Sequence, residues 1–258
     1  MARRSVLTYP VRMAQVGVLA LALLSLSGCG GGGGAGSGSP SASGPAPTAT
    51  AVTSGSTGTT VAGTMQEETY QGCPPQGDGG DTDLNLRKNR IDAAPDQPVS
   101  LRSLLALTWP RGVEQVRRSA WAPDDAAAVA KNEGRAVTVE GYVLLVRHEG
   151  PESPNCHDAT ARDYHTWLST APSADFADRA NSMVVEFTPR VVANNTGWGG
   201  EASLLRLKGR HVRVSGWLML DQEHPEQVGK TRGTLWEIHP ITRVLADING
   251  AWQDLNTE

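Results

Sequence analysis

The chain has 258 residues, with 27 acidic side chains against 23 lysines and arginines and a formal net charge of −4. Removing an N-terminal leader at residues 1–28 takes away three arginines and no acid, so the charge becomes 20 minus 27, or −7. Nonspecific nucleic-acid binding depends on basic side chains that neutralise phosphates, so this balance disfavours it. The body that follows, from about residue 66, is one domain's worth of chain.

Residues 1–28 have the order of a secretory leader. Arg3, Arg4 and Arg12 come first, an uncharged apolar stretch follows at residues 13–26, and small residues end the segment. The apolar stretch is shorter than the roughly 20 residues that a membrane-spanning helix needs. We therefore expect a signal peptide that is removed.

The leader ends in Leu26-Ser27-Gly28-Cys29, which resembles the lipobox of bacterial lipoprotein precursors. The resemblance implies cleavage before Cys29, a diacylglycerol thioether on its thiol, and membrane lipid as a partner. Acyl chains contribute about 0.8 kcal/mol per buried CH2, so several together hold a protein at a membrane almost permanently. The expected location is the cell envelope, at the outer face of the cytoplasmic membrane or at the outer membrane. The alternative is an ordinary secretory signal with a chance cysteine.

The lipidated cysteine and a linker make up residues 29–65. Residues 30–64 consist almost wholly of Gly, Ser, Ala, Thr and Pro and carry no charge. Such a composition cannot offset the entropy of ordering, so we expect a flexible tether with a root-mean-square span of about 30 to 35 Å. The tether would keep the folded body clear of the membrane surface.

Two short helices are predicted in the N-terminal extension, residues 66–134. The first covers residues 101–107 behind the cap residue Ser100. The second begins at Pro123, whose fixed φ suits a first helical turn, and ends at Gly134. We expect these helices to pack on the outside of the domain that follows.

Residues 135–258 predict a small barrel. The expected strands are residues 135–148, 164–169, 182–188, 211–220 and 234–244. Gly141 suits a first strand that bends to serve two sides of a barrel, and a helix at residues 201–208, closed by Gly209, separates the third and fourth strands. Three strands, a helix and two strands is the order of the OB-fold. We therefore expect a mainly β fold, an OB-fold-like five-stranded barrel with short helices and an N-terminal helical extension; an SH3-like barrel or an α+β sandwich are alternatives.

Acids and histidines gather within the predicted barrel. Glu237 and His239 are two residues apart on one strand, so they share a face. His165 and Glu186 lie on neighbouring strands and could pair across them. The candidate site residues are His165, Glu186, Asp221, His224, Glu237 and His239.

Four motifs in this region carry a family resemblance. They are Asp163-x-His165, the strand-final Glu186, the segment from Gly216 through Asp221 to His224, and Glu237-x-His239-Pro240. In this order they resemble a family of functionally uncharacterised bacterial proteins. The resemblance covers less than half of the chain; it implies an OB-type barrel and no established reaction.

The candidate residues allow two interpretations. They can converge as a nitrogen and oxygen ligand set for Zn²⁺, Mn²⁺ or a similar divalent ion. Such an ion would be structural, or would activate a water in a metal-dependent hydrolase or nuclease-like enzyme. Alternatively, the same groups form hydrogen bonds and ion pairs that close the barrel, because buried polar groups need partners. We favour the second interpretation.

Cys73 and Cys156 remain once Cys29 is assigned to lipid. The compartment reached by a secreted chain permits disulfides, and a bridge would fasten the N-terminal extension to the barrel. Two free thiols, or a metal site that includes Cys156-His157, are the alternatives.

The sequence as a whole favours a membrane-tethered envelope lipoprotein that presents an OB-like binding or structural module of unknown ligand, rather than an enzyme. A metal-dependent hydrolase at the His/Asp/Glu positions is the leading alternative. An oligonucleotide or oligosaccharide binder is another. Stacking of single strands on a barrel face needs basic neighbours, and the fourth strand offers only Arg210, His211 and Arg213.

Overall fold

The computed structural model describes residues 65, 68–173 and 175–257. The expected leader, the lipidation site Cys29 and nearly all of the linker lie outside these residues. None of the described helices is long and apolar enough to cross a membrane.

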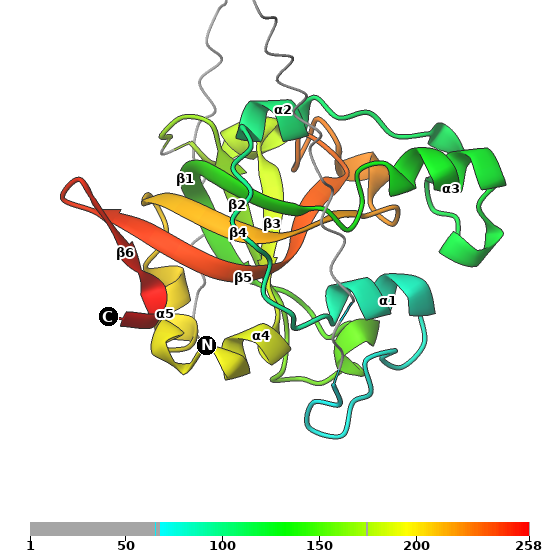
Figure 1. Cartoon of the computed structure of the whole chain (residues 1–258), viewed down its shortest axis with the longest axis horizontal. Coiled ribbons are helices and arrows are strands. Elements are labelled where there is room, and N and C mark those ends of the chain that lie inside the picture. Colours follow the sequence, from blue (N-terminus) through cyan, green and yellow to red (C-terminus); the bar gives the residue numbers. More distant parts are fainter. Residues whose placement is uncertain (1–64, 66–67, 174, 258) are drawn as a thin grey trace, which may run out of the picture. The chain divides into compact units, whose positions relative to one another are not determined.

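Five strands close into a barrel, and a sixth strand extends it (Figure 1). The strands are β1 (Ala136–His148), β2 (Tyr164–Ser169), β3 (Met183–Phe187), β4 (His211–Leu220), β5 (Trp236–Ile248) and β6 (Ala251–Asp254). Their order in the sheet is β3-β2-β1-β4-β5-β6, and β3 also pairs in parallel with β5 where Val185 meets Ile238. This closure confirms the expected OB-like fold class.

Short helices surround the barrel. The α-helices are α1 (Thr82–Lys88), α2 (Leu101–Leu105), α3 (Pro123–Ala130), α4 (Pro189–Asn194) and α5 (Glu201–Leu205). Short 3-10 helices lie at Arg111–Val113, Arg118–Ala120, Ser153–Asn155, Phe176–Asn181, Thr196–Trp198, Pro225–Gln227 and Leu255–Thr257. The three predicted helices are present but shorter than expected, whereas α1 and α4 were not predicted. α1 begins where the Asp81 carboxylate accepts hydrogen bonds from the backbone N–H groups of Asp83 and Leu84.

The last strand is longer than predicted and turns back on itself. β5 continues past residue 244 to Ile248, and β6 pairs with it in antiparallel fashion. Asn249 and Gly250 join the two strands, with φ angles of 55° and 84°. An Asn-Gly pair with both φ angles positive is the favoured tight hairpin turn. The local signal for this hairpin was therefore present in the sequence.

The barrel interior is apolar. Val139, Leu168, Val185 and Ile238 are each no more than 1% exposed and belong to one continuous core. Gly141 lies where β1 passes close to β2: a Cβ atom at this position would be 2.7 Å from Cγ of Leu168. Glycine permits this approach because it has no side chain to collide with Leu168.

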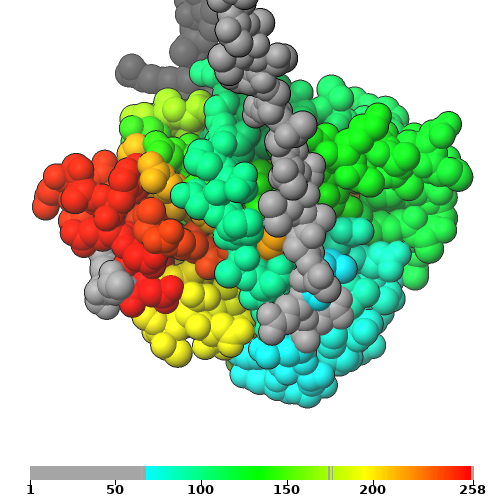
Figure 2. Space-filling view, in the orientation of Figure 1, coloured from blue at the N-terminus to red at the C-terminus, as the bar shows by residue number. Residues whose placement is uncertain are grey.

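The N-terminal extension packs on the outside of the barrel. A disulfide joins Cys73 to Cys156 in the loop after β1, with the two Cα atoms 5.8 Å apart, so the suggested bridge is present. α1 contacts β5 and the Ser153–Asn155 turn, and Figure 1 shows it, in cyan, beside that light green turn. In Figure 2 the chain from α1 to α2, cyan to blue-green, lies directly against the barrel surface.

Two side chains, one in the extension and one in the barrel, add hydrogen bonds to this attachment. Nδ2 of Asn89 donates to the backbone carbonyls of Pro75 and Pro154, at 2.9 and 2.7 Å. The indole Nε1 of Trp217 on β4 donates to the carbonyl of Asp92 at 2.9 Å. The extension is therefore part of the folded body rather than a loose appendage.

Candidate functional site

The candidate side chains lie on the outer face of β2, β3 and β5. Val185 and Ile238 belong to the core, and successive residues of a strand point to opposite faces, so Glu186, Glu237 and His239 point outward. Each of these three is nevertheless no more than 1% exposed. We call the set around them the buried polar layer; its members are Lys88, Asp163, His165, Glu186, Asp221, Arg232, Glu237 and His239.

The two loops beside this face and the extension cover the layer. The loop between β1 and β2 supplies Glu152, and the loop between β4 and β5 supplies Asp221 and Arg232. Lys88, the last residue of α1, is 5% exposed and places Nζ 3.6 Å from Oε2 of Glu152. In OB-folds the β2–β3 face and these two loops commonly bind ligands. Here α1 of the chain's own extension packs against β5 and the Ser153–Asn155 turn beside that face.

His165 and Glu186 form the cross-strand pair that the sequence suggested. They are direct partners in the β2–β3 register, and Nε2 of His165 lies 2.6 Å from Oε1 of Glu186. The other ring nitrogen lies 3.2 Å from Oε1 of Glu149. Burial opposes the charged imidazole, but the neighbouring carboxylates outweigh it and raise the pKa of His165.

His239 lies among three carboxylates. Its Nδ1 is 3.4 Å from Oε1 of Glu237 and 3.6 Å from Oε2 of Glu186, and its Nε2 is 3.7 Å from Oδ2 of Asp163. These separations are longer than ordinary hydrogen bonds. All five atoms are buried and have no hydrogen-bond partner.

The charges around His239 perturb its titration and that of its neighbours. Burial favours the neutral ring, yet Glu186, Glu237 and Asp163 together raise the pKa of His239 to about 10. Burial raises the pKa of the Asp163 carboxyl to about 7, although His239 opposes this. Burial also opposes ionisation of Glu186, but His165 and His239 hold its pKa well below the usual range.

A second part of the layer is organised by Arg232. Its Nη1 lies 2.7 Å from Oδ2 of Asp221 and 3.3 Å from Oε2 of Glu237. Asp221 also contacts Nδ1 of His224 at 2.7 Å. Burial favours the neutral acid, but Arg232 and His224 keep the pKa of Asp221 far below its ordinary value. Arg232 thus links the loop between β4 and β5 to the environment of His239.

The six predicted candidates lie in three different environments. His165, Glu186, Glu237 and His239 meet in the buried polar layer. Asp221 joins them through Arg232. His224 lies at the rim with 35% of its side chain exposed and contacts Asp221.

Three important members of the layer were not among the six predicted candidates. Asp163 precedes His165 by two residues, so the same alternation that paired other candidates could have placed it on their face. Arg232 follows no recognisable pattern in its loop. Lys88 comes from the extension, and nothing local indicates that α1 covers the barrel.

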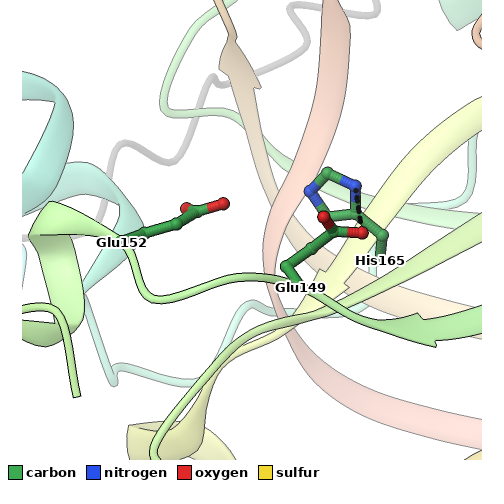
Figure 3. Close-up of side chains that lie close together, drawn as sticks. All are labelled: Glu149, Glu152 and His165. Carbon is green, nitrogen blue, oxygen red and sulfur yellow. Dashed lines mark ion pairs between the residues drawn. The ribbon is translucent and has the colours of Figure 1, made fainter. Parts of the chain in front are cut away.

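Two groups among the described residues could hold a metal ion. The buried one comprises Asp163, Glu186 and His239, whose ligand atoms lie within 4.8 Å of one another. The other comprises Glu149, Glu152 and His165; Figure 3 shows the Glu149 carboxylate against the His165 ring, with Glu152 reaching from the far side.

The buried group has little free space beside it. A cavity that touches His239 and Trp217 has a volume of about 10 Å³, which is room for about one water molecule. A groove of about 600 Å³ lies elsewhere, beside α2, with Thr138, Glu140 and Arg213 in its wall. The cavity at His239 is therefore far smaller than pockets that admit organic substrates, which are roughly 300 to 1,000 Å³.

Comparisons of the chain with known protein-family models, with curated proteins and with solved structures find no match.

Proposed function

We propose that the protein is a lipoprotein of the cell envelope, tethered through acylated Cys29, whose OB-like barrel serves as a binding or structural module rather than an enzyme. The lipobox motif at residues 26–29 and the linker composition support the tether. The Cys73–Cys156 disulfide also supports export, because structural disulfides persist in oxidising compartments.

We favour a module over a hydrolase because the N-terminal extension covers the buried polar layer. A metal-dependent hydrolase must bring its substrate to the activating groups. Glu186, Glu237 and His239 are no more than 1% exposed, and the cavity beside His239 holds about one water. The same covering weakens the oligonucleotide and oligosaccharide alternatives, which use the β2–β3 face.

The tether is tested by changing the lipidation site. Cells expressing the parent chain or Cys29→Ala are labelled with a fatty-acid analogue and fractionated. The expected result is a labelled membrane-bound parent and an unlabelled variant that keeps its leader. Normal labelling of Cys29→Ala would contradict the proposal.

The choice between module and enzyme is tested by activity. The full chain, supplied with Zn²⁺ or Mn²⁺, is assayed against phosphodiester, ester and glycoside model substrates beside Glu186→Gln. A matched control is Glu140→Gln, which alters an exposed carboxylate of β1. We expect no turnover that distinguishes the three proteins. Metal-dependent turnover that Glu186→Gln abolishes and Glu140→Gln retains would establish the enzyme instead.

A further inference from the structure

Five buried polar atoms at His239 and the carboxylates beside it lack a hydrogen-bond partner. Oδ2 of Asp163, Oε2 of Glu186, Oε1 of Glu237 and both ring nitrogens have no partner atom. A buried polar group without a partner costs about 1 to 3 kcal/mol, and more if it is charged. Two ring nitrogens and three carboxylate oxygens beside them therefore call for a group that binds them together.

These atoms could be satisfied by hydrogen bonds from a protonated ring or by a bound ion, and the distances bear on this choice. If a protonated ring donated to the carboxylates, the charge-assisted bonds would measure about 2.7 to 2.9 Å. The observed separations are 3.4, 3.6 and 3.7 Å. One nitrogen of His239, one oxygen of Asp163 and one oxygen of Glu186 lie within 4.8 Å of one another, which is close enough for a single ion to bind all three.

The charge balance of the layer points the same way. Its four buried carboxylates belong to Asp163, Glu186, Asp221 and Glu237. The permanent cations that face them are Arg232 and Lys88. Lys88 also faces Glu152, so the permanent cations are fewer than the carboxylates around them. A bound cation would add to the compensation that buried charges require.

We propose that Asp163, Glu186 and Nε2 of His239 bind a single zinc ion beneath α1, where burial leaves the ion a structural role. Glu237 then accepts from the ring nitrogen that the ion leaves free, as carboxylates do for metal-bound histidines. The ligands come from the start of β2, from β3 and from β5, so the ion ties together the strands that close the barrel. This site is independent of the proposed lipid tether.

The neighbouring group of Glu149, Glu152 and His165 is a poorer candidate because its acids already have cations. Oε1 of Glu149 accepts from the guanidinium of Arg147 at 2.9 and 2.7 Å. Glu152 has Lys88 as its partner. This group supplies a matched control for the experiment.

The test measures zinc in the full chain purified without chelator. Parent, Asp163→Asn and Glu149→Gln are analysed by elemental mass spectrometry. We expect about one zinc per chain in the parent and in Glu149→Gln, and at least about tenfold less in Asp163→Asn. Zinc that is absent from the parent, or that is retained in Asp163→Asn and lost in Glu149→Gln, would overturn the proposal.

A second measurement covers the case in which Asp163→Asn does not fold. Because the site is buried, the ion binds during folding. The parent, with its disulfide intact, is unfolded in urea, freed of metal with a chelator and refolded with Zn²⁺, with Mg²⁺ or without metal. We expect Zn²⁺ alone to restore the original Tm. An equal Tm in all three samples would overturn the proposal.

Discussion

The two outer faces of the barrel use similar side chains in opposite surroundings. On the face of β2, β3 and β5, Arg232 pairs with Asp221 while each side chain is no more than 2% exposed. On the face of β1 and β4, Arg213 pairs with Glu140 while their side chains are 32% and 48% exposed. The difference follows from the N-terminal extension, which covers the first pair.

In this contrast burial, rather than residue type, determines how strongly stability depends on each partner of an ion pair. In water an exposed pair contributes about 0 to 1 kcal/mol. A buried pair gains little over an apolar replacement of both partners, but removing one partner leaves an uncompensated charge at a cost of about 3 to 5 kcal/mol. The covered face is therefore sensitive to single substitutions, and the open face is tolerant.

The largest effect should come from Arg232→Met. The substitution leaves Asp221 and Glu237 without their shared cation and should lower the free energy of unfolding by about 3 to 5 kcal/mol. Urea unfolding of the full chain measures it. Adding Asp221→Asn should recover part of the loss. A single variant within about 1 kcal/mol of the parent would show that the pair behaves like a surface pair.

Removing the disulfide should uncover the polar face. Cys73→Ser with Cys156→Ser should cost about 2 to 5 kcal/mol, because the bridge closes a long segment of chain. Hydrogen exchange should then show faster opening of the backbone amides of α1 than of β4. If α1 amides keep their parental protection, the extension is held by its hydrogen bonds rather than by the bridge.

A smaller effect with a defined pH dependence is expected at the rim. The hydrogen bond to Asp221 raises the pKa of His224, so its contribution is fully present below the unfolded pKa of about 6.5 and is lost as pH rises through the folded value. His224→Asn should therefore destabilise the chain most in acid, by under about 1 kcal/mol, and progressively less in alkali. Unfolding curves of both proteins across this range test the trend. A difference that grows with pH would refute it.

The smallest effect is expected on the open face. Arg213→Met should change the free energy of unfolding by less than about 1 kcal/mol, and added salt should reduce even this difference. Urea titrations at low and high salt measure it beside Arg232→Met. A loss comparable with that of Arg232→Met would remove the distinction between the faces.

Local patterns were sufficient for the barrel and for part of its site. Apolar and β-branched runs identified β1 to β5, and the two-residue spacing of Glu237 and His239 placed them on one face. The pairing of His165 with Glu186 also followed from strand order. The same spacing rule would have included Asp163, and the Asn249-Gly250 pair would have predicted β6. These signals depend only on residues that are close together in the chain, so they can be recognised in the sequence.

The lipobox at Cys29 and the linker composition are likewise properties of the sequence, and they remain its predictions. Only the tertiary structure decided that the polar face is buried. The helix α1 lies some 75 residues before Asp163 in the chain, and a disulfide and several hydrogen bonds to backbone groups hold it against the barrel. The tertiary structure also decided that Arg232 and Lys88 lie beside the acids and that His224 stays at the rim. Burial and charge compensation depend on which distant segments meet, and no local pattern of residues specifies that.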